Sequence, residues 1–310
     1  MGTPTNLLSD SADLYWVHVA LLIVCGLLSL ISFIVQSLKP AKYGKFARPD
    51  VKNPYVTSAS ETTSLTAVDT SSAADLPAMA AGGTSGSAAP KEGGGFPARL
   101  SFFISDFVFV IPVWAVATFV IYDKYQRFAD ISATLIVYWI LWAAHFIQRG
   151  VIHPLILRYS MRNVGWDIFL PMMPVNALFT FINASFLATT VFPSDYESDP
   201  RFAVGIIVFV LGFIINRWAD WKLRSLRADG SREYRVPTGG LYEYVSCPNY
   251  LGEGLEWTGY LIGVWNWAAL VWLLFCLSTF IPRARQNHAF YRHTFPDYPK
   301  QRKALIPFVY

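Results

Sequence analysis

The segment VHVALLIVCGLLSLISFIVQ, residues 17–36, decides the fold class of this chain. It is a run of twenty residues that holds no lysine, arginine, aspartate or glutamate. An α-helix needs about 20 mostly apolar residues to cross the hydrocarbon core of a bilayer, so the segment predicts a membrane-spanning helix. The run starts too far along the chain, and after acidic rather than basic residues, to be typical of a cleavable signal peptide.

Further apolar runs of spanning length follow the first one. They are residues 101–122, 131–152, 168–192, 202–221 and 255–281. The last run is too long for one upright helix and contains Gly259, Gly263 and the pair Trp265-Asn266. We therefore interpret it as two short or tilted spans joined near Asn266, which gives seven transmembrane helices, with six as the alternative.

The composition agrees with a membrane protein. The 310 residues are 54% hydrophobic but only 15% charged, whereas a soluble domain carries about 25% charged residues. The long apolar runs exclude a disordered chain, a collagen-like chain and a basic nucleic-acid-binding protein, despite the net charge of +4. The cysteines lack the spacing of metal ligands or of a disulfide framework, and motifs for zinc, acyl-enzyme or nucleotide-hydrolysis chemistry are missing from the sequence.

The distribution of charge predicts the orientation in the membrane. Most of the 25 basic residues fall in four clusters that seven alternating spans place on one side. The clusters lie in residues 39–52, 158–162, 222–235 and 283–303. Because basic loops stay on the cytosolic side, we predict a cytosolic carboxy terminus. Six spans would place the basic tail on the opposite face.

Residues 56–95 differ in kind from the rest of the chain. More than two thirds of them are Ser, Thr, Ala or Gly, and such a segment buries too little apolar surface to offset its ordering entropy. We predict a disordered cytosolic insertion here. It divides the chain into the first transmembrane helix with its basic segment (1–55), the insertion (56–95) and an all-α membrane domain (96–310).

Several polar residues interrupt the predicted spans. Asp106 lies in the second span, and His145 and Arg149 share one helical face of the third, since they are four residues apart. Asn176 and Asn183 add amides to the fourth span. Ionisable groups inside a membrane are costly and usually face a cavity or a partner. For Asp106 and His145 two interpretations stay open, an interfacial or satisfied polar group and a member of a polar pocket.

A second set of polar residues lies at the cytosolic end of the fifth span. Spacings of four, four and three place them on one helical face. They are Asn216, Asp220, Arg224 and Arg227. Residues 234–257 then combine glycine turns with two carboxylates that enter an apolar span, Glu253 and Glu256. The tail 288–310 is rich in Tyr, Phe, Pro and Arg. Because guanidinium groups suit phosphates, we predict a cytosolic carboxy-terminal cap over a cavity for a phosphate-bearing cofactor.

Five motifs of the chain resemble the steroid 5α-reductase family, including its plant brassinosteroid-pathway members. They are NYLGEGLEW at 249–257, the tail FYRHTFPDYPKQRKALIPFVY at 290–310, YRVPTGG at 234–240, HFIQR at 145–149 and KPAKYGK at 39–45. The resemblance covers essentially the whole chain outside residues 56–95. Its carboxy-terminal motifs are specific, whereas the string PNYLGE also resembles related membrane reductases and methyltransferases.

This resemblance implies a seven-helix reductase of the endoplasmic reticulum membrane that uses NADPH in lipid metabolism and steroid biosynthesis. It implies hydride transfer to the β carbon of an enone, with a proton added at the α carbon. The implied substrate is a 3-oxo-Δ4 steroid or a similar lipophilic enone, and the implied partners are this small molecule and membrane lipid, without nucleic acid.

The resemblance also implies which residues bind NADPH. They are Arg149, Arg158, Asn216, Asp220, Arg224, Arg227, Tyr234, Arg235, Asn249, Glu253, Tyr291 and Arg302. Trp257 would help to wall the steroid pocket.

Two catalytic positions depart from the family pattern. The family polarises the substrate carbonyl with a glutamate in the second span and a tyrosine after the histidine in the third, where this chain has Asp106 and Phe146. Phenylalanine has no hydrogen-bond donor, and a positioned acid contributes typically 10²–10⁴-fold to a rate. Either another donor substitutes, such as His145 or a protonated Asp106, or the substrate or reaction differs.

Three other functions remain alternatives. The first is an enoyl-thioester or polyprenol reductase of the same superfamily. The second is a membrane methyltransferase that uses S-adenosylmethionine, which the many arginines disfavour because that cofactor carries no phosphate. The third is a catalytically idle sterol-binding protein, consistent with Phe146.

Overall fold

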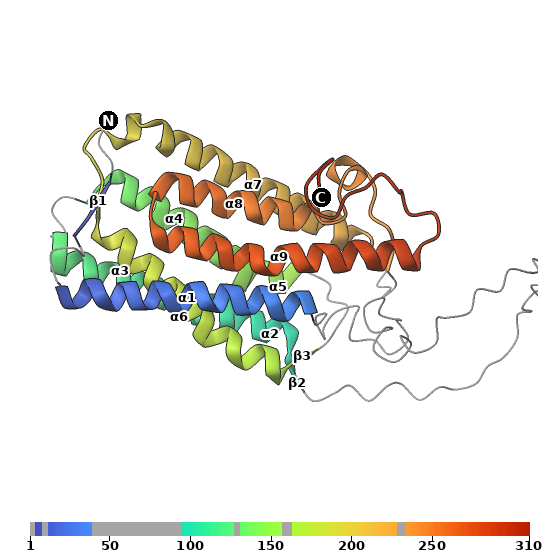
Figure 1. The fold of residues 1–310 in the computed structure, drawn as a ribbon, viewed down its shortest axis with the longest axis horizontal. Coiled ribbons are helices and arrows are strands. Elements are labelled where there is room, and N and C mark those ends of the chain that lie inside the picture. The colour runs from blue at the N-terminus through green and yellow to red at the C-terminus, as the bar shows by residue number, and fades with distance from the viewer. Residues whose placement is uncertain (1–3, 8–11, 39–94, 127–130, 157–162, 228–233) are drawn as a thin grey trace, which may run out of the picture.

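The computed structural model describes residues 4–7, 12–38, 95–126, 131–156, 163–227 and 234–310. These residues form a bundle of helices that run along a common axis, and the carboxy-terminal segment folds back at one end (Figure 1). The long helices are α1 (Ala12–Leu38), α3 (Ile111–Gln126), α4 (Ala133–Ile147), α6 (Trp166–Thr189), α7 (Pro200–Ser225), α8 (Pro248–Val264) and α9 (Trp267–Thr294). The predicted all-α class is therefore confirmed for the described residues.

Short elements complete the described part of the chain. The helical ones are α2 (Ala98–Phe102), α5 (His153–Ile156), the π-helical turns η3 (Phe103–Val108) and η5 (Gln148–Ile152), and the 3₁₀ turns η6 (Tyr196–Ser198) and η7 (Gly240–Glu243). Two antiparallel strand pairs tie loops together. They are β1 (Thr5–Asn6) with β4 (Thr190–Val191), and β2 (Gly95–Pro97) with β3 (Asn163–Gly165).

Six helical segments of the described chain are long and apolar enough to cross a membrane. They are Tyr15–Leu38, Ala98–Lys124, Ala133–Ile156, Trp166–Thr189, Pro200–Ser225 and Trp267–Thr294. The 17-residue helix α8 is shorter than these and returns beside α7 inside the bundle (Figure 1). A seventh crossing, formed by α8, stays a prediction. The predicted insertion lies outside the described residues except for Gly95, and Arg158 lies outside them as well.

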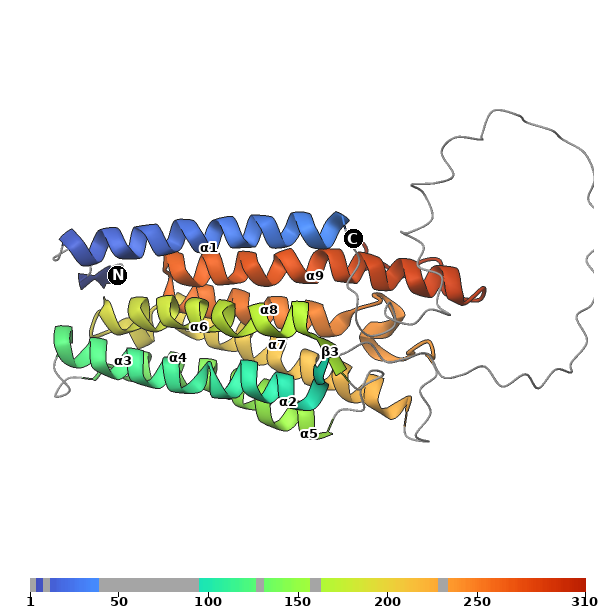
Figure 2. The same cartoon turned by 90° about the horizontal axis from the view of Figure 1, so that it is seen from below.

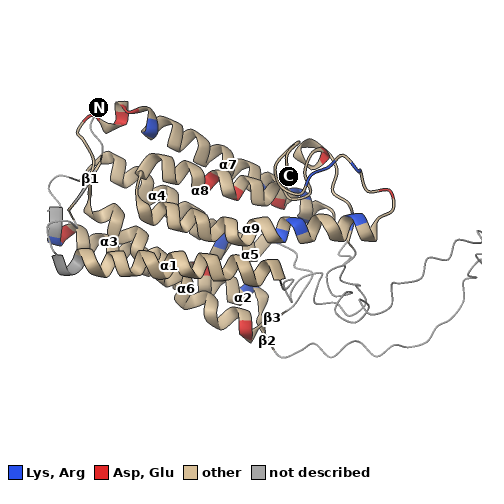
Figure 3. Ribbon diagram, viewed as in Figure 1, with Lys and Arg blue, Asp and Glu red and all other residues tan. Residues whose placement is uncertain are grey.

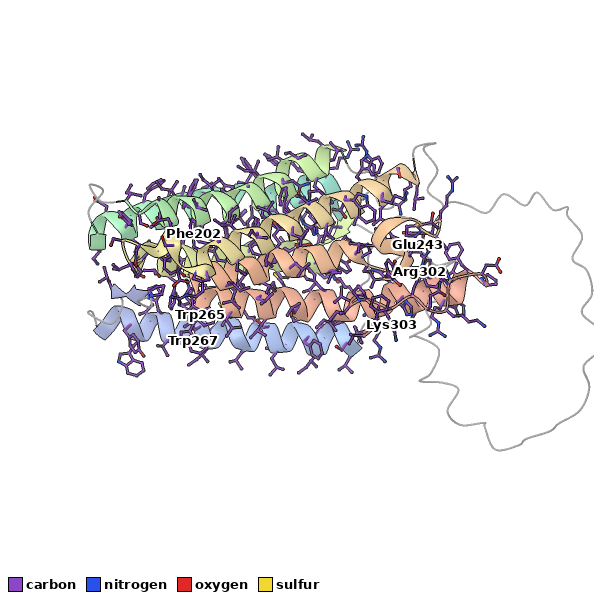
Figure 4. The ribbon with its side chains drawn as sticks, turned by 90° about the horizontal axis from the view of Figure 1, so that it is seen from above. Phe202, Glu243, Trp265, Trp267, Arg302 and Lys303 are labelled. Atoms are coloured by element: carbon purple, nitrogen blue, oxygen red, sulfur yellow. The ribbon has the colours of Figure 1, made fainter. Side chains whose placement is uncertain are left out.

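The predicted break near Asn266 is confirmed and has a local cause. Trp265 ends α8 with a backbone φ of 47°, in the left-handed region that stops a right-handed helix. Asn266 then begins α9 as its N-cap, because its side-chain oxygen accepts a hydrogen bond of 2.9 Å from the backbone N–H of Ala269. Trp265 and Trp267 flank this turn (Figure 4), and the Arg201 guanidinium at the start of α7 lies over the Trp265 ring at 5.9 Å.

Helices α7 and α8 pack along a seam of small residues. On α7 the buried residues recur at alternating spacings of four and three, and they are Gly205, Phe209, Gly212, Asn216 and Ala219. Gly252 and Gly259 lie on the matching face of α8. A Cβ atom on Gly252 would lie 2.5 Å from the backbone nitrogen of Asn216. Glycine therefore allows the two backbones to approach closely, as small residues do between membrane helices.

Hydrogen bonds at Gln36 join α1 to α9. The amide of Gln36 on α1 donates to Thr279 Oγ1 (2.9 Å) and accepts from Arg283 Nε (3.0 Å). Gln286 Nε2 also donates to the main-chain carbonyl oxygen of Gln36 at 2.7 Å. The two helices lie side by side, and α9 continues past α1 beyond the rest of the bundle (Figure 2).

Charge is distributed unequally between the two ends of the bundle. Lysine and arginine gather where α9 emerges and the chain folds back (Figure 3). The opposite end carries the acidic loop that includes Asp195, Glu197 and Asp199. Glu243, Arg302 and Lys303 lie at the basic end (Figure 4). This asymmetry agrees with the charge pattern on which the predicted orientation rests.

Candidate active site

Two π-helical turns bring Asp106 and Arg149 together. Asp106 lies in η3 and Arg149 in η5, and such turns within α-helical segments often occur at functional sites. A Cβ atom on Gly150 would lie 2.7 Å from the backbone nitrogen of Phe107, so glycine permits the contact between the turns. Arg149 Nε consequently lies 3.9 Å from Asp106 Oδ2.

The Asp106 carboxyl group is buried and oriented by neutral donors. Ser105 Oγ donates to Asp106 Oδ1 at 2.8 Å, and Asn176 Nδ2 of α6 donates to the same oxygen at 2.9 Å. Asn176 also donates to the Ser105 carbonyl oxygen at 3.3 Å. Oδ1 is thus occupied by two donors while Oδ2 faces Arg149, which fixes the orientation of the carboxyl group.

Glu253 and Glu256 connect α8 to the histidine and arginine of the third span. His145 Nδ1 lies 2.6 Å from Glu256 Oε1, and His145 Nε2 lies 3.8 Å from Glu253 Oε1. The other oxygen of Glu253 lies 4.0 Å from Arg149 Nη1. We call Asp106, His145, Arg149, Glu253 and Glu256 the polar cluster. It unites four predicted site residues with Glu256, and for these the polar-pocket interpretation agrees with the geometry.

The predicted residues of α7 adjoin this cluster. Asn216 Nδ2 donates to the Asn249 carbonyl oxygen at 2.9 Å and to Glu253 Oε2 at 3.4 Å. The Asn216 side-chain oxygen accepts from Arg217. One turn further along α7, Asp220 Oδ2 lies 3.3 Å from His153 Nδ1. Polar contacts therefore run from Asp106 to Asn216, and a further polar pair lies one turn closer to the basic end of α7.

Sequence reasoning left Ser105, His153, Arg217 and Glu256 without a role. A signal existed for two of them. His153 continues the spacing of four from His145 and Arg149, and Glu256 follows Glu253 by three residues on the same helical face. Arg217 stands beside the predicted face of α7 rather than on it, and Ser105 acquires its role only from the π-helical turn.

An aromatic cluster borders the polar cluster. It consists of Trp142, Phe146, Trp257, Tyr260 and Trp272, all at most 6% exposed. The Trp257 ring lies 4.5 Å from the ring of His145 and 6.0 Å from that of Phe146. Phe146 is only 4% exposed and packs against Trp142 and Trp272 as well. Phe146, which stands where the family has a tyrosine, is thus packed among aromatic rings.

Residues 234–247 and 295–310 form a cap at the basic end, where Lys303 is hydrogen-bonded to the segment around Val245. The Lys303 N–H donates to the Tyr244 carbonyl oxygen at 2.8 Å, and its own carbonyl oxygen accepts from Ser246 N at 2.9 Å. Ser246 Oγ lies 2.7 Å from the Tyr298 hydroxyl oxygen. Burial raises the pKa of Tyr298, so this hydroxyl stays protonated at neutral pH.

Several of the predicted cofactor-binding residues lie in the cap or contact it. The Arg227 guanidinium lies over the Tyr234 ring at 5.3 Å, and the Tyr291 ring stacks on Tyr298 at 5.4 Å. Arg235 Nη1 donates to the Leu226 carbonyl oxygen at 3.2 Å. Arg224 lies on the same part of α7, partly exposed. These contacts join the ends of α7 and α9 to the cap.

Arg302 has a distinct environment inside the cap. It is 2% exposed, donates from Nη1 to the Pro237 carbonyl oxygen at 2.9 Å and lies 3.6 Å from Glu243 Oε2. Its guanidinium also lies over the Tyr298 ring at 5.2 Å. In these contacts, Arg302 joins the carboxy-terminal segment to the loop before α8.

Comparison with known proteins identifies relatives. The family profile described as 3-oxo-5-alpha-steroid 4-dehydrogenase matches residues 167–310. A steroid 5-alpha-reductase of tomato (Solanum lycopersicum) is 38% identical over 172 residues, which are 54% of this chain and 66% of that protein. The human 3-oxo-5-alpha-steroid 4-dehydrogenase 2 is 46% identical over 119 residues, 38% of this chain and 47% of that protein.

The relative from cotton (Gossypium hirsutum) is matched over a longer stretch. It is a steroid 5-alpha-reductase, 35% identical over 201 residues, which are 62% of this chain and 76% of that protein. The match with the tomato relative, by contrast, covers just under two thirds of that protein. On the profile and on the cotton relative, the chain belongs to the 3-oxo-5-alpha-steroid 4-dehydrogenase, or steroid 5-alpha-reductase, family.

Proposed function

We propose that this protein is an NADPH-dependent membrane reductase that reduces the carbon–carbon double bond of a 3-oxo-Δ4 steroid or similar lipophilic enone. One observation carries the proposal. The polar cluster lies deep in the bundle, with an aromatic wall on one side and a path of polar residues toward a basic cap on the other. The names of the relatives point to the same reaction class.

The residues on α7 and α8 fit a phosphate-bearing dinucleotide. Arg217 Nε and Nη1 are buried and have no hydrogen-bond partner among the described residues, so this guanidinium has donors left for an anionic ligand. Asn216, Asn249 and Glu253 supply amide and carboxyl groups of the kind that ribose and carboxamide groups require. NADPH, when bound, supplies the hydride for the β carbon of the enone.

The polar cluster can orient the reacting groups and hold a proton. The hydrogen bond between His145 Nδ1 and Glu256 Oε1 fixes the imidazole ring, which contacts Trp257 at the aromatic wall. Asp106, held by Ser105 and Asn176, faces Arg149. We assign Asp106 and His145 to the handling of the proton that the α carbon receives, while the aromatic wall excludes water from the reacting carbons.

The proposed setting is the endoplasmic reticulum membrane, crossed seven times with the carboxy terminus in the cytosol. Support comes from the collection of lysine and arginine at the cap end (Figure 3). The rule that basic segments remain cytosolic then places the cap where cytosolic NADPH can reach it.

Purified protein in detergent tests the proposed reaction. We expect NADPH oxidation that depends on a 3-oxo-Δ4 steroid from a panel, with the 4,5-reduced steroid as the product. Binding of NADPH without turnover of any steroid in the panel would contradict the steroid assignment, and turnover of enoyl thioesters or polyprenols would replace it. Thermal stabilisation by S-adenosylmethionine and not by NADPH would overturn the reductase assignment altogether.

A further inference from the structure

The aromatic cluster contains hydrogen-bond donors that have no acceptor. The indole Nε1 atoms of Trp142, Trp257 and Trp272 and the hydroxyl oxygen of Tyr260 are buried without a hydrogen-bond partner among the described residues. All four side chains are more than nine-tenths buried. Trp114 stacks on Trp142 at 4.7 Å but is different, because its indole N–H donates to the Trp139 carbonyl oxygen at 3.2 Å.

Such a group of unpaired donors calls for an explanation. Buried polar groups in native proteins nearly always have a partner, and a specific exception points to a functional role or an unobserved ligand. Here the exceptions lie in contact with each other. Trp257 is within 5.1 to 6.1 Å of the rings of Trp142, Trp272 and Tyr260.

The ring geometry offers these donors at best weak acceptors. The rings of Trp257 and Trp272 are nearly perpendicular, at 85° and 5.3 Å, so an indole N–H could approach a π face there. Contacts of an N–H group with an aromatic face are second-order compared with a hydrogen bond to oxygen. An oxygen atom of a bound molecule would satisfy the donors far better.

We propose that the Trp257 indole N–H is a specificity-determining donor that binds the acceptor oxygen of the lipophilic substrate. Trp257 is selected because its ring contacts both His145 of the polar cluster and Phe146, which offers no donor. The ligand is a small apolar molecule with a carbonyl or hydroxyl oxygen, because the donors are neutral and lie among aromatic rings. This inference rests on the proposed function and names the group that recognises the substrate oxygen.

The test compares two ligands on one protein. Equilibrium binding of radiolabelled 3-keto steroid and of its 3-deoxy analogue is measured in detergent for the wild type and for Trp257→Phe, which keeps an aromatic ring but loses the N–H. We expect the wild type to prefer the ketone by about tenfold, the upper range for one neutral hydrogen bond, and the variant to lose this preference. Trp114→Phe is the matched control, and it should keep the preference.

The ratio of the two affinities is unaffected when part of the variant protein is inactive, so a folding defect does not imitate the expected result. An unchanged preference in Trp257→Phe would overturn the inference and leave the proposed reductase intact. A wild type that binds neither steroid would overturn both. Loss of the preference in a protein that never oxidises NADPH would support the donor role and contradict the reductase.

Discussion

Asp106 shows how a carboxyl group is accommodated within an apolar helical segment. Its two oxygens face three different groups, namely the Ser105 hydroxyl, the Asn176 amide and the Arg149 guanidinium. None of these three contacts alone neutralises a buried charge, but together they replace the water that a carboxylate loses on burial. The residue therefore depends on the correct packing of η3, η5 and α6 around it.

Replacing Asp106 tests its part in the proposed reaction. We expect Asp106→Ala and Asp106→Asn to lower kcat by roughly 10²–10⁴-fold, the usual contribution of a positioned acid or base. Steady-state NADPH oxidation with the best steroid substrate measures the effect. Ser185→Ala is the control, because among the described residues that hydroxyl bonds only to the Phe181 carbonyl oxygen of its own helix. Unchanged turnover in Asp106→Ala would remove Asp106 from the proposed machinery.

Phe146 allows a second test at the same scale. If Trp257 already donates to the substrate oxygen, a new hydroxyl group at position 146 is largely redundant. We expect Phe146→Tyr to change kcat by less than about threefold in the wild type, a fraction of one hydrogen bond. In the Trp257→Phe background the same change should restore turnover. A large gain in the wild type would show that the donor at this position is missing and not replaced.

The sequence predicted much of the polar cluster because charged residues inside apolar runs are rare enough to stand out. Asp106, His145 and Arg149 were detectable in this way, whereas Glu253 was predicted from the family resemblance. Ser105 was not, because a π-helical turn contains an extra residue and shifts the helical phase that a period of 3.6 assumes. Contacts across helices, such as that of Asn176 with Asp106, depend on rotations that no single helix encodes.

At the scale of elements, the contact between α7 and α8 depends most strictly on small side chains. Its seam places glycine where any side chain would press on the facing backbone. The spacings in the sequence of α7 predicted one face of polar residues, but that prediction did not include the glycines of the seam, Gly205 and Gly212. The small residues on the same seam were an equally strong signal for close helix packing.

Two glycines in the same turn of α8 make a matched pair of variants. A Cβ atom on Gly252 would lie 2.5 Å from Asn216 N, whereas one on Gly254 would lie 3.7 Å from Leu277 Cδ2, an ordinary contact. We expect Gly252→Ala to destabilise the protein by about 1–3 kcal/mol. Gly254→Ala should be neutral or stabilise it by up to about 1 kcal/mol through helix propensity. Thermal unfolding in detergent, followed by circular dichroism, measures both, and equal effects would contradict the packing of the seam.

The start of α7 supplies a pH-dependent prediction. Asp199 caps the helix by accepting from Arg201 N, and its carboxylate binds the Arg201 guanidinium at 2.7 Å. Hydrogen bonds from the side chain and backbone of Arg201 lower the pKa of Asp199 from 3.8 to about 2. A lowered pKa means that this stabilisation is present above about pH 4 and is lost as the pH falls through about 2.

We therefore expect Asp199→Asn to lower the Tm at pH 7, because asparagine keeps a capping oxygen but loses the ion pair. The difference from the wild type should shrink as the pH approaches 2. Asp195→Asn in the same loop is the control, since the structure gives the Asp195 side chain no role as a helix cap. A difference in Tm between the variant and the wild type that does not shrink as the pH falls from 7 to about 2 would contradict the assigned ion pair.

At the scale of the whole molecule, hydropathy located the first five spanning segments well but missed the limits of α8 and α9. Helix α8 begins at Pro248, seven residues before the apolar run that predicted it, because Glu253 and other polar residues lower the hydropathy of its first turns. Helix α9 continues to Thr294 although its last third is basic. The polar residues of the candidate site thus lower the local hydropathy at these helix ends, so hydropathy alone does not locate the ends.

The predicted orientation is testable with single reporter cysteines. Cys25, Cys247 and Cys276 are buried, so they give little background labelling. Val309 is 73% exposed in the cap, and Trp267 is 67% exposed at the opposite end. In sealed microsomes we expect an impermeant maleimide to label Val309→Cys directly and Trp267→Cys only after permeabilisation. The reverse result would place the cap in the lumen.

The length of α9 has a consequence for the membranes in which the protein fits. Its 28 residues extend for about 42 Å at roughly 1.5 Å per residue, while the hydrocarbon core of a bilayer measures about 30 Å. This one helix connects Trp267, at the end of the bundle opposite the cap, with Tyr291, which stacks on Tyr298 of the cap. Membranes differ in thickness, from about 27 Å in the endoplasmic reticulum to about 32–33 Å at the cell surface. In a thicker bilayer, the basic end of α9 and the cap would lie closer to the lipid headgroups. The thickness of the host membrane would therefore set how much of the cap is exposed to water.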